Sequence, residues 1–351
     1  MSDTSTTTAT STNTSALSRP RRLSRLLGAV LFRLAFALLY LWCLGAIWYS
    51  NVGPGFLRAI VMLAFAVVFP LMWYRSPRTW IGNRRYVSAV FYLTAAALII
   101  AWQFKRPSND GDWSPDVAVL PWVEFEGDRV TIHNIRHCDY RSVDDYDVRH
   151  YDAAFDLNEL TTVHFMVEPF SAFRGPAHTM LAFGFADGRH FAISVELRKE
   201  IGEAFHPLPG FFKQFELIYV VGDERDLIQL RTHHRKHEVY FYPIKATTEH
   251  KRALLTDMLR RANDLRDRPE FYNTITSSCT TNIVHHVNKL IDGPRTFNLK
   301  VLLPAMADEL AHDMGLIDTV LPFEKAREYF RIDQRAQRED GTPLSQRIRV
   351  K

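Results

Sequence analysis

Three long apolar runs occupy the first third of the chain and set it apart from the residues that follow. They extend from Leu27 to Tyr49, from Leu57 to Tyr74 and from Tyr86 to Phe104. Each is close to the roughly 20 apolar residues that a helix needs to cross a bilayer. The pattern therefore predicts three transmembrane helices rather than a buried helical hairpin, and the first run is too long for a cleavable signal peptide.

Positive charge is distributed unevenly beside these runs. The connection between the first two holds only Arg58, at its edge. Arginines are concentrated before the first run and between the second and third, at positions 19, 21, 22, 25, 75, 78, 84 and 85. Loops rich in Lys and Arg stay in the cytoplasm. We therefore expect a multi-pass topology with a cytoplasmic N-terminus, and the chain leaves the third span on the opposite side.

After Pro107 the apolar residues recur at the spacing of short strands and later of helices. The clearest element is a hairpin, in which Asp187-Gly188 connects 178–185 to 189–197. Further strands are predicted over 129–135, 161–167, 215–221 and 238–244, and helices over 248–265 and 276–290. Strands followed by helices indicate an α+β domain, with an antiparallel sheet and C-terminal helices.

Composition divides the 351 residues into four parts. Residues 1–26 are Ser/Thr-rich and basic and are expected to be disordered, and 27–106 hold the three transmembrane helices. Residues 107–330 form the globular domain, and 331–351 form a polar tail that is expected to be poorly ordered. The net charge of +4 gives no argument for a nucleic-acid partner, because the excess arginine lies beside the apolar runs and near the C-terminus.

Cys279 is the first candidate for chemistry. It follows Ser277 and Ser278 and begins an apolar helical run, so the serines predict a helix N-cap. A cysteine at that position feels the positive end of the helix dipole, which favours the nucleophilic thiolate. Two alternatives are a small buried residue and, in an oxidising compartment, a disulfide with Cys138.

A nucleophilic cysteine needs a base, and His178 is the candidate. It opens the first strand of the hairpin after a Gly-Pro turn, which places it at the rim of the sheet. A third group should orient the imidazole, and the returning strand offers Ser194 and Glu196 on one face. A plain two-residue turn pairs position 178 with 197, whereas one extra bulged residue pairs 178 with 196. We favour Glu196 as the third residue, with Ser194 as the alternative.

The other histidines carry less information. The three within Arg231–His237 lie among three cations, which predicts a solvated loop and disfavours a metal. His286 follows Cys279 by seven residues and is a weaker alternative base. The charged segment Gly222–Asp226 is interpreted as a structural ion-pair corner rather than a rim of the site. Because the Cys-to-His spacing fits no usual zinc pattern, we expect neither a metal nor a cofactor.

Together these residues resemble a known family, the Lnb N-terminal periplasmic domain, over roughly Val130 to Leu290. The resemblance rests on Asn134-Ile135-Arg136, Tyr140-Arg141, Ala177-His178-Thr179, Ser194-Val195-Glu196-Leu197-Arg198, Asp223-Glu224-Arg225-Asp226, Tyr272-Asn273 and Cys279-Thr280-Thr281. It implies a permuted papain-like (NlpC/P60-like) fold, in which the histidine precedes the cysteine. Cys279 would then be the nucleophile and His178 the base.

Members of that family characterised as Lnb are bacterial lipoprotein N-acyltransferases. The resemblance therefore implies a periplasmic domain at an inner membrane, with phospholipid or lipoprotein acyl chains as partners. Two departures concern the substrate. In the family the membrane spans typically follow the domain, whereas here they precede it, and Ser278 stands where an asparagine often precedes the cysteine.

Three functions are consistent with these features. The first is a membrane-anchored thiol acyltransferase, and we expect it to carry an apolar groove for lipid. The second is a cysteine hydrolase acting on cell-wall peptides, which should present a polar cleft. The third is a non-catalytic tethered module, in which Cys279 only packs.

Overall fold

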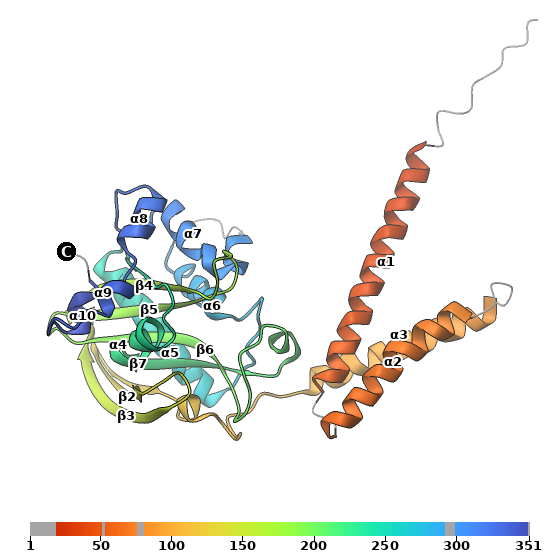
Figure 1. The fold of residues 1–351 in the computed structure, drawn as a ribbon, viewed down its shortest axis with the longest axis horizontal. Helices are drawn as coiled ribbons and strands as arrows, with labels where there is room; N and C mark the ends of the chain where they lie inside the picture. The colour runs from red at the N-terminus through yellow and green to blue at the C-terminus, as the bar shows by residue number, and fades with distance from the viewer. Residues whose placement is uncertain (1–18, 51–52, 76–80, 292–298, 350–351) are drawn as a thin grey trace, which may run out of the picture. The chain divides into compact units, whose positions relative to one another are not determined.

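Three apolar helices form the first of two compact units, Met1–Lys105, and the second unit is Arg106–Lys351. The computed structural model describes residues 19–50, 53–75, 81–291 and 299–349 (Figure 1). The helices are α1 (Arg19–Trp48), α2 (Gly55–Arg75) and α3 (Ile81–Phe104). Each contains a segment that is long and apolar enough to cross a membrane, namely Ser24–Trp48, Gly55–Met72 and Arg85–Phe104. The prediction of three apolar N-terminal helices is confirmed.

The expected disorder of residues 1–26 is wrong for the last part of that segment. Residues 1–18 lie outside the described residues, but the chain is already helical from Arg19. Pro20 is compatible with this start, because a proline in the first helical turn gives up an N–H that has no acceptor within the helix.

Aromatic side chains hold the three helices of the first unit together. Phe91 lies with its ring centroid 4.8 Å from those of Phe36 and Phe69. The Tyr40 hydroxyl donates a hydrogen bond of 2.9 Å to the carbonyl of Ala66. Most other apolar side chains of these helices are exposed, as expected for a segment whose outer surface contacts lipid.

An eight-stranded sheet forms the centre of the second unit (Figure 1). The strand order is β1-β2-β7-β6-β5-β4-β8, with β3 also paired to β2, and all pairs are antiparallel except the parallel pair β2–β7. The strands are β1 (Trp122–Glu126), β2 (Arg129–Tyr140), β3 (Tyr146–Asp156), β4 (Leu160–Pro169), β5 (Ala177–Phe185), β6 (His190–Arg198), β7 (Glu216–Asp223) and β8 (Tyr240–Pro243). Every predicted strand is present, whereas β1 and β3 were not predicted.

Helices accompany the sheet, so the predicted α+β class is confirmed. They are α4 (Glu224–Gln229), α5 (Thr248–Asp267), α6 (Cys279–Val287), α7 (Ala307–Asp313), α8 (Phe323–Tyr329), α9 (Asp333–Ala336) and α10 (Leu344–Arg347). Short 3₁₀ segments lie at Pro115–Val117, Leu157–Glu159, Pro209–Phe212, Leu299–Leu302 and Pro304–Met306, and a π-helical turn lies at Leu230–His234.

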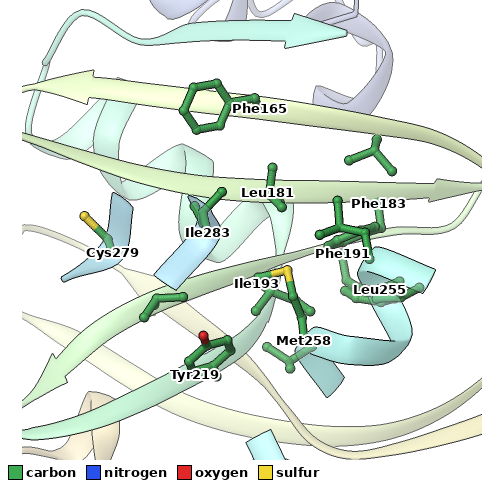
Figure 2. Close-up of a cluster of buried hydrophobic side chains, with 14 of the residues drawn as sticks. Phe165, Leu181, Phe183, Phe191, Ile193, Tyr219, Leu255, Met258, Cys279 and Ile283 are labelled. Atoms are coloured by element: carbon green, nitrogen blue, oxygen red, sulfur yellow. The ribbon is translucent and has the colours of Figure 1, made fainter. Parts of the chain in front are cut away.

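Both faces of the sheet are covered by helices. Successive side chains of a strand point to opposite faces, so neighbouring residues belong to two different cores. Leu181, Phe183 and Ile193 belong to the core shared with α5 and α6, and Figure 2 shows Cys279 at one end of this cluster beside Ile283. Met180 and Ala182 belong to a second core, shared with α4, α9 and α10. The site described below lies where these two faces meet at the start of β5.

The β5–β6 hairpin has the bulged register. Met180 pairs with Ser194 and Gly184 with His190, which is the register with one extra residue, and Glu196 Oε1 lies 3.9 Å from His178 Nε2. Gly188 has φ +84°, a conformation that glycine adopts without strain and that this kind of turn requires. Of the two registers considered from the sequence, the one with an extra residue is confirmed.

A β-bulge in β2 changes the direction in which the side chains of Asn134-Ile135-Arg136 point. The register with β3 shifts between Ile132 and Ile135, and Asn134 has φ 61°, which asparagine tolerates better than most residues. Because of the inserted residue, Ile132 and Ile135 both point into the core beside α5 and α6. Arg136 consequently points to the opposite face, toward α4.

The expectation of a poorly ordered C-terminal tail is wrong. Residues 331–349 form α9 and α10, and Ile332, Ala336, Leu344 and Ile348 are buried in the second core. These four apolar residues are spaced four or eight positions apart, so one helical side is apolar although the segment is polar on average. The prediction was based on the average polarity of the segment, which does not reflect this spacing.

Replacing Ile332 with alanine tests this packing. Ile332 is fully buried and its N–H donates to the carbonyl of Val239, so we expect the free energy of unfolding to fall by about 2–5 kcal/mol. Chemical denaturation of the full chain in detergent measures it. Arg338→Ala, at an exposed position of the same segment, should change it by less than about 0.5 kcal/mol. Equal effects of the two substitutions would contradict the packing described here.

Candidate active site

Cys279 is the first residue of α6. Ser278 is the N-cap: its side-chain oxygen accepts from the N–H of Thr281, and the Thr281 hydroxyl accepts from the N–H of Ser278 at 2.7 Å. This reciprocal capping box fixes the first turn of the helix. The N-cap predicted from the serines is therefore present, and the thiol lies at the positive end of the helix dipole.

The thiol is buried but has partners that favour its ionised form. Burial alone raises the pKa of Cys279. Hydrogen bonding and charge from His178, together with the hydroxyl and backbone of Thr179, lower the pKa by more than burial raises it, so that the resulting pKa is about 7. The Thr179 hydroxyl also lies 3.1 Å from the hydroxyl of Thr280. The structure thus brings Cys279 and His178 together, from elements about a hundred residues apart in the sequence.

A chain of hydrogen bonds runs from the imidazole to a carboxylate. His178 Nε2 lies 2.7 Å from Ser194 Oγ, and Ser194 Oγ donates to Glu196 Oε1 at 2.7 Å. Because the hydroxyl proton is used toward Glu196, Ser194 Oγ accepts from the N–H at Nε2. Nδ1 of His178 is then the nitrogen that can accept a proton. Ser194 stands between His178 and Glu196, whose Oε1 is 3.9 Å from Nε2.

A second carboxylate flanks the imidazole on the other side. Glu168 on β4 pairs directly with His178, and Glu196 approaches His178 from β6, so the three residues form a row across three strands. Arg231 connects the two carboxylates, with Nε 2.8 Å from Glu168 and Nη2 3.3 Å from Glu196. His237 Nδ1 adds a contact of 2.8 Å to Glu168.

Both carboxylates remain ionised at neutral pH. Burial raises the pKa of Glu168, but Arg231, the hydrogen bond from His237, and Arg235 lower it to about 2. Burial likewise raises the pKa of Glu196, and Arg136, Arg231 and His178 lower it to about 2. The imidazole therefore has an ionised carboxylate on each side.

The structure corrects the interpretation of Arg231–His237 as a solvated loop. Leu230–His234 is a π-helical turn in which Arg231 is only 3% exposed, and His237 is bonded to Glu168. Arg231, Glu168 and Thr179 are site residues that were not identified from the sequence. One signal was available for Glu168, because a carboxylate that ends an apolar strand needs a buried partner.

The ion-pair corner expected at Gly222–Asp226 is present. Asp223 caps α4 by accepting from the N–H of Arg225, and Asp226 is fully buried. Arg136 holds Asp226 in a two-pronged ion pair, with distances of 2.8 and 2.9 Å. Among the charges that lower the pKa of Glu196, that of Arg136 has the largest effect, so this corner stabilises the ionised form of Glu196.

The structure does not place His286 as a base for Cys279. Its Nε2 lies 2.8 Å from the Tyr219 hydroxyl, and its Nδ1 lies 2.6 Å from Asp257. Tyr219 in turn donates to Asn282, whose amide donates to the carbonyl of Ser278. His286 thus belongs to a buried chain that holds the first turn of α6 in place.

An apolar cavity of about 440 Å³ lies beside α6. Thr280, adjacent to Cys279, lines it together with Ile283, Val284 and Val287 on one side of α6. The sheet contributes Phe165 and Leu181, and α7 contributes Leu310 and Ala311. A cavity of this size and lining accommodates a hydrocarbon chain better than a peptide.

Cys138 and Cys279 are both free, so the alternative of a disulfide between them is wrong. Among the residues that the structure describes, no three His, Cys, Asp or Glu side chains are arranged to hold a metal ion.

Comparison with known proteins identifies one family. Residues 146–311 match the family model described as the Lnb N-terminal periplasmic domain. The match lies within the second unit and includes both Cys279 and His178. No curated protein and no solved structure matches the chain, so the papain-like part of the expected fold stays a prediction.

The pH dependence of Cys279 alkylation tests the environment of the thiol. Because the pKa of Cys279 is lowered to about 7, the rate of reaction with iodoacetamide should rise with a midpoint near pH 7. Cys138 is an internal control, because burial raises its pKa to about 12 and it should stay unlabelled there. His178→Ala should move the Cys279 midpoint upward, since burial then dominates. Peptide mapping by mass spectrometry measures both sites, and a midpoint unaffected by His178→Ala would contradict the pairing.

Proposed function

Because the chain carries a domain of the Lnb N-terminal periplasmic family together with three candidate membrane helices, we propose that it is a membrane-anchored thiol acyltransferase. One observation carries the proposal. A thiol whose pKa is lowered to about 7 begins the helix that lines an apolar cavity. The first part supplies a nucleophile, and the second supplies a place for the hydrocarbon part of an acyl donor.

The first half-reaction forms a thioester. His178 Nδ1 takes the proton of Cys279, and the sulfur attacks the carbonyl carbon of an acyl ester. The carbon–sulfur bond forms, the carbon–oxygen bond of the ester breaks, and the imidazolium gives its proton to the departing alcohol oxygen. Ser194 keeps the N–H of Nε2 in place during both transfers, and Glu196 and Glu168 stabilise the imidazolium.

The second half-reaction transfers the acyl group. An amine attacks the thioester carbon, a carbon–nitrogen bond forms and the thiolate leaves. The amine proton passes to His178 and then to the sulfur, which restores the starting state. Lipoprotein N-acylation is the reaction of this class that the family suggests, with the amine at a lipoprotein N-terminus.

The start of α6 offers donors for the oxyanion. The N–H of Thr281 is bonded to the side chain of Ser278, and the N–H of Asn282 to its carbonyl. The N–H groups of Cys279 and Thr280 are the remaining donors of the first turn, and the helix dipole adds to their effect. A tetrahedral oxyanion beside the sulfur would be stabilised by such preorganised donors.

The character of the cavity favours the transferase over a cell-wall hydrolase. A hydrolase for wall peptides needs a polar cleft that can bond amide groups, whereas the cavity next to Thr280 is lined mainly by Val, Leu, Ile, Phe and Ala. Anchoring also favours lipid, because tethering keeps the site at a high effective concentration of membrane substrates. With the arginine distribution beside the spans, we infer an inner-membrane protein whose domain lies in the periplasm.

Trapping the thioester tests the chemistry. The full chain is reconstituted in vesicles of a phospholipid with one acyl composition, and we expect a mass increase of one acyl group on Cys279. Cys279→Ala should abolish it, because burial raises the pKa of Cys138, the other cysteine of the second unit. Peptide mapping locates the adduct, and hydroxylamine should remove it. Release of wall peptides without any acyl adduct would support the hydrolase instead.

Narrowing the cavity tests where the acyl chain lies. Ala311 lines the cavity from α7, so Ala311→Phe should shift the preference toward shorter acyl chains by about tenfold while leaving Cys279 alkylation unchanged. Competition between donors of two chain lengths, read by adduct mass, measures the preference. Val320→Phe is a matched control, because Val320 is fully exposed and does not line the cavity. An unchanged preference in Ala311→Phe would place the chain elsewhere.

A further inference from the structure

Apolar side chains are exposed on three loops of the second unit. Phe173, in the loop between β4 and β5, is 73% exposed. Phe205 and Leu208, in the loop between β6 and β7, are about half exposed, as is Ile275 in the loop before α6. We call these four residues the apolar rim. Exposed groups of large apolar residues mark interaction surfaces more often than scattered single ones do.

The three loops contact one another and border the candidate site. The rings of Phe170 and Phe205 lie 5.7 Å apart, which connects the first loop to the second. The Thr274 hydroxyl donates to the carbonyl of Pro207 at 2.6 Å, which connects the third loop to the second. The first loop leads into β5 and His178, the second begins after β6 and Glu196, and the third leads into Cys279.

The linker that follows the last membrane helix reaches the domain at the same loop. Ser108, four residues after the end of α3, donates its N–H to Glu216 at the start of β7. The carbonyl of Asp112 accepts from the N–H of Ile201, just after β6. Both ends of the β6–β7 loop are therefore bonded to the membrane linker. Figure 1 shows this loop extending beyond the end of the sheet.

The charge of the loops indicates the kind of surface that they fit. Residues 170–176, 199–215 and 268–278 contain four Lys or Arg and three Glu side chains, so they are nearly neutral. A nearly neutral surface with exposed Phe, Leu and Ile has no strong attraction for a polyanion. It fits a lipid surface, in which the apolar side chains leave water and no charge has to be buried.

We propose that the apolar rim inserts into the surface of the bilayer that holds the chain, so that the mouth of the site opens at the lipid boundary. The partner is a lipid surface of any headgroup charge, not one particular lipid. The inference rests on the membrane anchor and the exposed loops, and it does not depend on Cys279 being a nucleophile. It extends the proposed function, because it explains how a donor lipid can reach a site buried at a helix start.

Lipid photolabelling of the full chain tests the insertion. Cys279→Ala, which cannot form a thioester, is reconstituted in phosphatidylcholine vesicles that contain a fraction of phosphatidylcholine with a diazirine in its acyl chain. Peptide mapping should find the label in all three loops and in the membrane helices. The combined change Phe205→Ser and Leu208→Ser should reduce loop labelling at least fivefold, and Phe173→Ser gives the same test from a different loop. Raising the salt concentration should leave loop labelling unchanged, because the rim does not rely on charge.

Val320 is the matched control for exposure alone. It is fully exposed and apolar but lies between α7 and α8, outside the three loops, and it should stay unlabelled. Labelling of Val320 at the level of the rim, or loops without label, would overturn the insertion. Unlabelled loops would indicate a protein as the partner of the rim.

A water-soluble acyl donor separates this inference from the proposed function. Rim variants in the otherwise unchanged chain should acylate Cys279 normally from a short-chain soluble thioester, but at least tenfold more slowly from vesicle lipid. Equal loss with both donors would make the rim a structural part of the domain and overturn the inference. If no donor acylates Cys279 while the loops are still labelled, the proposed thiol chemistry is wrong, but the insertion of the apolar rim into the bilayer is supported.

Discussion

The arrangement around His178 depends on Arg231. A buried and a partly buried carboxylate next to one imidazole would repel each other, and burial raises the pKa of each. Arg231 lies between Glu168 and Glu196, and its guanidinium contacts both. Arg136 and Arg231 keep Glu196 ionised, and Arg231 is the first of the charges that keep Glu168 ionised. An unpaired charge at such a buried position would cost about 3–5 kcal/mol, which makes the guanidinium a structural requirement of the row.

The site also depends on the end of one strand, where two layers of the domain meet. Thr179 points to the face covered by α6 and bonds Thr280, while His178 points to the opposite face and bonds Ser194. Consecutive residues of β5 therefore contact α6 and the carboxylate network. Such a site can exist only where a strand begins, because farther along β5 the sheet separates its two faces. This explains why the loops that surround the site are those next to the strand ends.

Part of this could be predicted from local sequence. The Asp187-Gly188 turn predicts the hairpin, the serines before Cys279 predict the helix start, and the apolar runs predict the membrane helices, because each of these signals acts over a few residues. Arg231 and Glu168 could not be paired in the same way. They lie 63 positions apart, and only the pairing of β4 with β5 and the π-helical turn at Leu230–His234 brings them together. The tail was misjudged because its apolar residues are few, although they are correctly spaced for one side of two short helices.

The choice between Glu196 and Ser194 shows how local geometry can divide one role between two residues. Both were predicted to share a face, and Glu196 Oε1 lies 3.9 Å from His178 Nε2. The hydrogen bond nevertheless runs through Ser194, the diagonal neighbour, because its short hydroxyl lies between the ring and the carboxylate. A direct carboxylate contact would place a full negative charge at Nε2. The Ser194 hydroxyl instead orients the ring through a hydrogen bond and, polarised by Glu196, presents only a partial negative charge to Nε2. The imidazole is thereby held in one tautomer, with Nδ1 as the nitrogen that can accept a proton.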